Sequence, residues 1–237
     1  MQTLGGMPEV RDPESAGPAS PRVQVHRHPE RARYDRETID AILDEALICH
    51  LGVVVDGEPL VLPTGFGRVG DTLYLHGAAT NRSLAAAQDG VCITVTHVDG
   101  LVLARSAFGH SMNFRCVVVR GRARPVTDPE ERRAGLVAVV EHSLPGRWAE
   151  VRRPSAKEIE TTAVIAVDLA ECSAKVRTGP PLDPVSDRDL PVWAGEVPLR
   201  LVAGAPRPDP DLAEGIDEPA SVAEVLRRFP GPTPAGA

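Results

Sequence analysis

Aromatic residues are scarce in this sequence, at 3% of its 237 residues. A protein that stacks nucleic-acid bases needs exposed aromatic side chains, so this composition argues against a base-stacking platform. The net charge of −7 also lacks the basic excess that nucleic acids and anionic membrane surfaces attract. We therefore expect neither nucleic acid nor a membrane as a partner.

Cysteine is also rare, and no C-x-x-C pair occurs among Cys49, Cys92, Cys116 and Cys172. Scattered cysteines that lie mostly in apolar runs are typical of free, buried thiols in a reducing compartment. No apolar run reaches the roughly 18 residues of a membrane-spanning helix, and the N-terminus lacks an apolar signal segment. These absences predict a soluble cytoplasmic protein.

The seven histidines show no regular ligand spacing, so the sequence predicts no structural metal site. Three of them, His76, His97 and His110, lie in the central region of the chain, where only the fold can bring them together.

Composition divides the chain into three parts. Residues 1–25 and 203–237 are rich in Pro, Gly and charged residues, which is typical of disordered segments. Within the second of these, Val222–Phe229 is patterned like a short helix that ends at Pro230. Residues 26–202 contain no internal repeat and no linker, and we expect them to form one folded domain.

Most of this domain alternates in the manner of β-strands. Helical spacing follows Asp35 and recurs over Asp128–His142. Strand-like runs are Leu47–Val55, Pro59–Phe66, Leu73–His76, Val91–His97, Leu101–Ala107, Phe114–Arg124 and Thr161–Ala170. Asp56-Gly57 and Asp99-Gly100 are hairpin-turn signals. Tight turns between consecutive strands predict antiparallel pairing, and about six such strands predict a closed or nearly closed barrel.

Gly65-Phe-Gly67-Arg-Val-Gly70 matches the G-x-G-x-x-G pattern of dinucleotide-binding proteins. That pattern holds a pyrophosphate only where its glycines open a helix. Here a strand-like run follows, and Pro63 precedes it in a segment that suits an edge strand. We interpret the match as a hairpin turn.

Two polar stretches are candidates for ligand binding. In the first, His76 to Ser83, Gly77 permits close approach, and Thr80 or Asn81 can cap a helix whose free amides attract an anion. Arg82 in its first turn suits a bound phosphate, and a surface arginine that points away fits equally well.

The second stretch, Arg105 to Arg115, gathers arginine, serine, histidine and asparagine near the expected ends of two strands. Such a set suits a ligand with a phosphate and a polar heterocycle, and a polar hairpin loop is the alternative. Ser111 and His110 do not form a nucleophilic pair, because neighbouring residues on an extended chain point to opposite faces.

At these residues the sequence resembles the pyridoxamine 5′-phosphate oxidase-like split barrels, in their flavin-nucleotide-binding branch that includes relatives of nitroimidazole-resistance proteins. The resemblance covers about residues 31–199. Its motifs, in chain order, are Leu73-Tyr-Leu-His-Gly77, Gly100-Leu-Val-Leu-Ala-Arg-Ser-Ala107, His110-Ser-Met-Asn-Phe-Arg115, Pro145-Gly-Arg-Trp148, Ala174-Lys-Val-Arg177 and Val192-Trp-Ala-Gly195. It implies a mainly β protein with flanking helices, a six-stranded antiparallel split β-barrel, that forms a homodimer with FMN at the subunit interface.

The resemblance also implies which residues contact the cofactor. The phosphate is expected at Arg82 with the 76–83 turn and at polar groups of the 111–115 segment. The isoalloxazine is expected along Pro63 to Gly65, with Arg105 and Ser106 nearby. The full expected set is Pro63, Thr64, Gly65, His76, Gly77, Ala78, Asn81, Arg82, Ser83, Arg105, Ser106, Ser111, Met112, Asn113, Phe114, Arg115, Lys175, Arg177 and Trp193. His76 and His110 are candidate catalytic proton donors, because histidine titrates near neutrality.

The sequence departs from the family motif at Phe114 and Cys116, which replace a tyrosine and a serine, and it has no clear match to the residues that bind pyridoxal phosphate. The implied activity is that of an FMN-dependent oxidoreductase that takes electrons from a reduced nicotinamide and passes them to a small organic substrate. A non-enzymatic flavin-binding module, a haem-binding split barrel and a deazaflavin protein are the alternatives.

Overall fold

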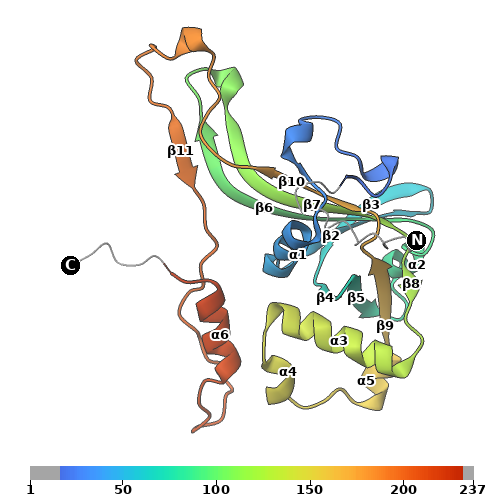
Figure 1. The fold of residues 1–237 in the computed structure, drawn as a ribbon. Helices are drawn as coiled ribbons and strands as arrows, with labels where there is room; N and C mark the ends of the chain where they lie inside the picture. The colour runs from blue at the N-terminus through green and yellow to red at the C-terminus, as the bar shows by residue number, and fades with distance from the viewer. Residues whose placement is uncertain (1–16, 232–237) are drawn as a thin grey trace, which may run out of the picture.

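The computed structural model describes residues 17–231, in which antiparallel strands form two sheets flanked by helices (Figure 1). The larger sheet contains, in spatial order, β1 (Ala32–Arg33), β10 (Cys172–Arg177), β7 (Ser111–Gly121), β6 (Val91–Leu103), β2 (Cys49–Val55) and β3 (Glu58–Thr64), with β11 (Gly195–Pro198) paired to β6. The smaller sheet contains β4 (Gly67–Val69), β5 (Thr72–Ala78), β9 (Thr162–Asp168) and β8 (Arg124–Pro125). The expected mainly β, antiparallel architecture is confirmed.

The helices are α1 (Arg36–Glu45), α2 (Arg82–Ala86), α3 (Pro129–Ser143), α4 (Arg147–Glu150), α5 (Ala156–Glu160) and α6 (Ala220–Arg228). Helix α1 begins where expected, because the Asp35 carboxylate accepts a hydrogen bond from the backbone N–H of Thr38 at 2.8 Å. Short 3₁₀ turns lie at Pro21–Val23, Pro29–Arg31, Ala107–Gly109 and Val185–Asp187. Within residues 17–231 no helix is long and apolar enough to cross a membrane.

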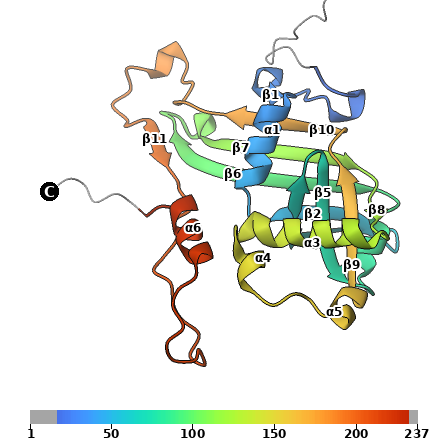
Figure 2. The same cartoon turned by 60° about the horizontal axis from the view of Figure 1, so that its bottom comes forward.

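The main core lies between the two sheets and α1. Alternate residues of each strand point into it, such as Leu51 of β2, Ile93 of β6 and Leu75 of β5, together with Ile42 of α1. A second, smaller cluster forms where α3 covers the outer face of the smaller sheet and includes Tyr74. Figure 2 shows α3 lying across β5 and β9.

Two dipeptides expected to form hairpin turns behave differently. Asp56-Gly57 turns β2 into β3, with both residues at positive φ (54° and 84°), as predicted. Asp99-Gly100 does not turn: β6 continues through it with a bulge, and β7 returns only after residue 110. That prediction is wrong because both residues are held by neighbouring strands. Asp99 accepts hydrogen bonds from Arg115 on β7. Gly100 pairs with β11, which comes so close that a Cβ on Gly100 would lie only 3.0 Å from a carbonyl oxygen of that strand.

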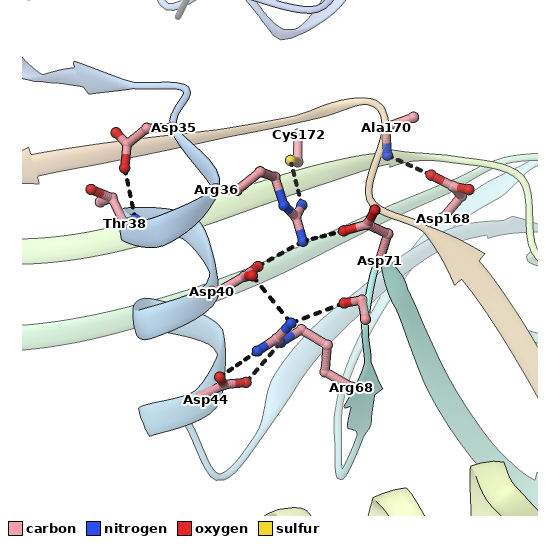
Figure 3. Close-up of polar contacts among 11 residues, drawn as sticks. Asp35, Arg36, Thr38, Asp40, Asp44, Arg68, Asp71, Asp168, Ala170 and Cys172 are labelled. Atoms are coloured by element: carbon pink, nitrogen blue, oxygen red, sulfur yellow. Dashed lines mark hydrogen bonds and ion pairs between the residues drawn. The ribbon is translucent and has the colours of Figure 1, made fainter. Parts of the chain in front are cut away.

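The G-x-G-x-x-G match is the β4–β5 hairpin, as predicted, with its turn at Gly70. Ion pairs attach this hairpin to α1 (Figure 3). Arg36 bonds to Asp40 at 2.6 Å and to Asp71 at 2.9 Å, and Arg68 bonds to Asp40 at 3.2 Å and also to Asp44. These pairs fix the smaller sheet against the helix.

Both ends of the described chain contact the body of the protein. In the segment expected to be a leader, residues 1–16 lie outside the described residues, whereas Val23 is buried and Ser20 donates a hydrogen bond to Glu171 at 2.6 Å. In the expected tail, α6 is held by Ser221, whose backbone N–H donates to Glu150 at 3.0 Å, and by Arg228. Residues 232–237 lie outside the described residues.

Candidate functional site

The turn expected to hold a phosphate lies where β5 ends and α2 begins. The side-chain oxygen of Asn81 caps α2 by accepting from the backbone N–H of Ser83 at 2.9 Å. Arg82 is 68% exposed and pairs with Asp56 in the β2–β3 turn. A Cβ on Gly77 would lie 3.0 Å from the Asn81 side chain, so glycine lets the strand pass close to the cap. The turn thus presents one exposed guanidinium beside a helix start whose side-chain cap is already in place.

Hydrogen bonds connect polar groups within the tip of the β6–β7 hairpin and join the tip to Asp183, which follows β10. Arg105 bonds to Asp183 at 2.8 Å, and the Asp183 side chain is only 3% exposed. The hydrogen bond from Arg105 lowers the pKa of Asp183. His110 Nδ1 accepts from the backbone N–H of Ala104 at 3.2 Å, and the Ser106 hydroxyl caps the following turn. Among the described residues, Arg105 Nε is buried without a hydrogen-bond partner.

The segment 111–115 divides between the two faces of the larger sheet. Asn113 and Arg115 alternate with Met112 and Phe114 along β7, so the two pairs point in opposite directions. Arg115 shares its face with the buried core residue Val117. One ligand on one face of a single chain therefore does not contact all of the residues expected in this segment.

Arg115 is already paired within the chain. Its guanidinium bonds to both oxygens of Asp99 at 2.8 and 2.9 Å and to Glu45 at 2.9 Å. These hydrogen bonds raise the pKa of Arg115, and the same contact lowers the pKa of Glu45. Arg115 therefore joins α1 to the β6–β7 hairpin.

The two other cations expected to contact the cofactor, Lys175 and Arg177, also form hydrogen bonds within the chain. Asn113 donates to Glu196 of β11 and accepts from Arg177, which also donates to the carbonyl oxygen of Gly179 at 3.0 Å. Lys175 donates to a backbone carbonyl of the N-terminal segment at 2.8 Å. In a single chain these groups hold β10 and β11 in place. Of the three expected arginines that form ion pairs, Arg82, Arg105 and Arg115, Arg82 has the most exposed side chain.

Apolar side chains are exposed over the outer part of the larger sheet. Strand β3 is exposed along nearly its whole length, with Val61 at 63%. On the outward row, Pro63 of β3 lies opposite His50 of β2, which lies opposite Thr94 of β6. Other exposed apolar residues on or near these strands are Val54, Leu60, Leu62, Val98, Leu101, Met112, Trp193 and Val197. An exposed apolar area of this kind is typical of an interaction surface. Thr64 and Gly65 follow Pro63 at its edge.

His76 lies in a different place. Along β5, Leu73 and Leu75 enter the main core, so Tyr74 and His76 face α3. His76 lines a cavity of about 440 Å³ between β5, α3 and the α4–α5 segment. The surrounding protein lowers the pKa of His76 by desolvation, although the ring is open to solvent through the cavity. Its imidazole is therefore neutral at pH 7.

The two candidate catalytic histidines are not brought together. His76 belongs to the smaller sheet beneath α3, and His110 lies at the tip of the β6–β7 hairpin, which projects from the body (Figure 1). Ala78 ends β5 beside the phosphate turn, and Ser111 begins β7 beside His110.

Sequence reasoning missed three features of these sites: the outward His50, the buried Asp183 partner of Arg105, and the cavity around His76. The two-residue alternation of β2 was a signal that could have placed His50. Asp183 and the cavity walls come from distant parts of the chain, and no local pattern marks them. Within residues 17–231, no group of three or more His, Cys, Asp or Glu residues is arranged to hold a metal ion.

Comparisons with known proteins agree with this fold. A family model described as pyridoxamine 5′-phosphate oxidase matches residues 35–176. The flavocytochrome Anf3 from Azotobacter vinelandii is 41% identical with a TM-score of 0.85, covering 88% of this chain and 98% of that one. The FAD and haem binding protein from Mycobacterium smegmatis is 35% identical with a TM-score of 0.78, covering 82% of this chain and 97% of that one.

A protein from Bacteroides thetaiotaomicron named for 5-nitroimidazole antibiotic resistance is 27% identical with a TM-score of 0.52, covering 61% of this chain and 86% of that one. No curated protein matches the chain. The family match spans more than half of the sequence, and two of the matched structures are more than 30% identical to the chain over more than two thirds of its length. The chain therefore belongs to the pyridoxamine 5′-phosphate oxidase-like family of flavin-binding split barrels.

Proposed function

We propose that this protein is a flavocytochrome, a redox protein that binds a flavin and a haem and acts as a homodimer. The observation that carries the proposal is the extent of its similarity to two proteins named for these cofactors. Each of them is matched over 97% or more of its length. The match to the flavocytochrome Anf3 covers 88% of this chain. The similarity therefore extends beyond residues 35–176, the part that the family model matches.

The flavin is proposed to lie along Pro63, Thr64 and Gly65, with Arg82 at its phosphate. The exposed side chain of Arg82 supports this position, because its present partner Asp56 is itself 71% exposed and an exposed pair separates at little cost. The family resemblance leads to FMN, whereas the relative from M. smegmatis is named for FAD. We favour FAD, since that relative is matched over nearly all of its length.

A homodimer is supported by the exposed apolar strands. A second copy placed over β2 and β3 would remove side chains such as Val61 from water, which stabilises association. Light scattering of the purified protein tests this. A dimer that Val61→Glu weakens is the expected result, and a monomeric wild-type protein contradicts it.

The cofactors supply the redox chemistry: a bound flavin accepts hydride or single electrons, and a bound haem carries single electrons. The protein supplies position and charge. A reduced nicotinamide is the proposed electron donor, and the proposed activity is therefore that of an oxidoreductase.

The absorption spectrum of the purified protein, recorded before and after denaturation, tests the proposal. Flavin bands together with a Soret band are expected, and chromatography of the released flavin distinguishes FAD from FMN. A flavin without haem would reduce the proposal to a flavin-binding protein. A colourless protein that takes up neither added flavin nor hemin contradicts it altogether. Anaerobic reduction by NADH or NADPH then tests the activity, and no acceleration with either donor would leave a non-enzymatic flavin-binding module.

A further inference from the structure

The N-terminal segment carries a charge opposite to that of the chain as a whole. Residues 17–34 contain four arginines and one glutamate, a net charge of +3, whereas the whole chain carries −7. The rest of the chain therefore carries −10. The two 3₁₀ turns of this segment, Pro21–Val23 and Pro29–Arg31, contact β7 and β10 (Figure 1). Folding thus places a positive segment against the larger sheet of an acidic protein.

Two cations of the larger sheet hold this segment. Arg120 of β7 donates to the carbonyl oxygen of Arg22 at 3.1 Å, and Lys175 of β10 donates to that of Arg27 at 2.8 Å. The neighbours of Arg120 and Lys175 along the strands enter the main core, so both cations lie on the opposite, outer face of the sheet. Arg22 and Arg27 are themselves exposed. The four positive charges are therefore gathered at this face.

The hydrogen bonds in this region use neutral acceptors. Arg33, in β1, donates to the carbonyl oxygens of Glu30 and Ala32 at 3.1 and 2.7 Å. A carbonyl oxygen fixes a guanidinium or an ammonium group in place without cancelling its charge. By contrast, Arg82 and Arg115 pair with carboxylates. This part of the surface therefore keeps its positive charge.

The carboxylates of this region have other partners. Glu30 lies 3.1 Å from His28 and 3.6 Å from Arg31, and Glu171 accepts from Ser20 at 2.6 Å. Five cations of the region form no ion pair within residues 17–231, and we call them the N-terminal basic patch: Arg22, Arg27, Arg33, Arg120 and Lys175.

The size and the surroundings of the patch favour a compact partner. A membrane surface or a nucleic-acid duplex extends beyond the patch and meets the negative charge of the rest of the chain, which repels it. A small acidic protein can contact the patch alone. Complementary charge speeds and orients such an encounter.

We propose that the N-terminal basic patch is the docking site for a small acidic protein that carries single electrons. The electron-carrier part of this inference rests on the proposed function, because a flavin and a haem together convert the two electrons of a hydride into single electrons. One reduced nicotinamide would lose two electrons and release one proton, and two oxidised carriers would each gain one electron. No bond forms between the protein and the carrier.

The patch shares the outer face of the larger sheet with the proposed flavin position. Lys175 lies opposite Cys116 of β7, and Cys116 lies opposite Thr96 of β6. Thr96 is two residues from Thr94, which belongs to the outward row that starts at Pro63. A carrier on the patch therefore lies on the face along which the flavin is proposed. Single electrons, unlike hydride, pass between groups that do not touch.

Binding of purified cytochrome b5, a small acidic one-electron carrier, to the full-length protein tests the inference. We expect calorimetry to show binding at about 20 mM salt that weakens at least about tenfold at about 200 mM, because salt screens exposed charges. Arg22→Glu combined with Arg27→Glu is expected to weaken binding at low salt at least about tenfold. Neither side chain forms a hydrogen bond within residues 17–231, so the fold should be retained, and circular dichroism checks this.

Arg188→Glu combined with Arg207→Glu is the matched control. Both arginines are exposed in the C-terminal part of the chain, and the double substitution changes the net charge by the same amount. This control should bind the carrier nearly as well as the wild type. With cofactors bound, the wild type should also pass electrons from NADH or NADPH to cytochrome b5 faster than the variant of Arg22 and Arg27.

Four outcomes would overturn the docking site: no binding of cytochrome b5 at low salt, undiminished binding in the variant of Arg22 and Arg27, equal weakening in the matched control, or binding of phosphatidylserine vesicles or duplex DNA in place of the carrier. Purified protein without flavin or haem contradicts the proposed function instead. Binding to the patch is still measurable in that case, so the two failures are distinguishable.

Discussion

Gly67 of β4 lies directly against the backbone of α3 at Ala138. A Cβ on Gly67 would overlap the carbonyl group of Ala138, so the helix can lie this close only because position 67 has no side chain. Gly65, two residues earlier, has open space at the equivalent position. The two glycines of one sequence pattern therefore have different structural roles, and neither role is the binding of a pyrophosphate at the start of a helix.

Gly67→Ala is expected to destabilise the protein by about 1–3 kcal/mol, because α3 must shift away from the sheet to admit a methyl group. Gly65→Ala is the matched control and should change the free energy of unfolding by less than about 0.5 kcal/mol. Urea unfolding of both variants measures the difference. Equal stabilities would mean that α3 does not pack on β4 as described.

The expected strands were largely correct because their alternation is local, whereas the two Asp-Gly dipeptides show where local information ends. Both are strong turn signals, but only Asp56-Gly57 turns. At Asp99-Gly100 the partners that keep β6 straight, Arg115 and β11, lie 16 and nearly 100 residues away in sequence. Contacts at that separation decide between a turn and a bulge, and a local pattern does not contain them.

The candidate site shows the same limit. A helix that begins after Thr80 or Asn81, with Arg82 in its first turn, follows from residues 76–83 alone. The structure selects Asn81 as the cap and leaves the Arg82 side chain exposed. The opposite faces of Asn113 and Phe114 also follow from alternation, although the sequence interpretation grouped them in one ligand site. The cavity around His76 could not be predicted, because its walls come from helices more than 50 residues later in the chain.

The stability of the protein is expected to depend on the protonation of His142. Burial lowers the pKa of His142, whose ring also packs on Phe66 with the ring centroids 4.3 Å apart. Between its folded pKa and about 6.5, the unfolded chain binds a proton that the folded protein does not, so the free energy of unfolding falls as pH falls through this window. His76 contributes in the same direction.

His142→Gln keeps a donor for the carbonyl oxygen of Ala46 and removes the titration. We expect its free energy of unfolding to fall less steeply than that of the wild type between about pH 7 and pH 5. Denaturant unfolding at several pH values measures the two slopes. Identical slopes would show that His142 titrates alike in the folded and unfolded states.

Arg228 is expected to anchor α6. Its guanidinium donates to the carbonyl oxygens of Asp44 at 2.7 Å and Glu45 at 3.0 Å, where α1 ends, and also to that of His142 near the end of α3. One cation thus satisfies carbonyl groups at two helix C-termini, where a positive charge is favourable. Arg227 is the natural comparison, since it pairs only with Glu224 on the same helix.

Arg228→Ala should lower the local stability of α6 by about 1.5 kcal/mol, within the range for hydrogen bonds to charged groups, and speed amide exchange over residues 220–229 about tenfold. Arg227→Ala should leave the exchange nearly unchanged, because exposed pairs contribute little. Hydrogen–deuterium exchange followed by mass spectrometry measures both variants. Faster exchange in the Arg227 variant alone would refute the anchoring role of Arg228.

Arg82 provides the test of the proposed flavin position, because its roles in stability and in binding are separable. The Arg82–Asp56 pair is exposed on both sides, so Arg82→Ala should change the free energy of unfolding by less than about 1 kcal/mol. The same substitution should weaken flavin binding by about tenfold or more, since it removes a charge-assisted contact to the phosphate. Asp56→Asn frees the guanidinium and is expected to leave flavin binding unchanged or to strengthen it. Titration of the apoprotein, followed by flavin fluorescence, measures the three affinities. Weaker binding in both variants would indicate that the intact ion pair shapes the turn, and unchanged binding in Arg82→Ala would exclude the 76–83 turn as the phosphate site.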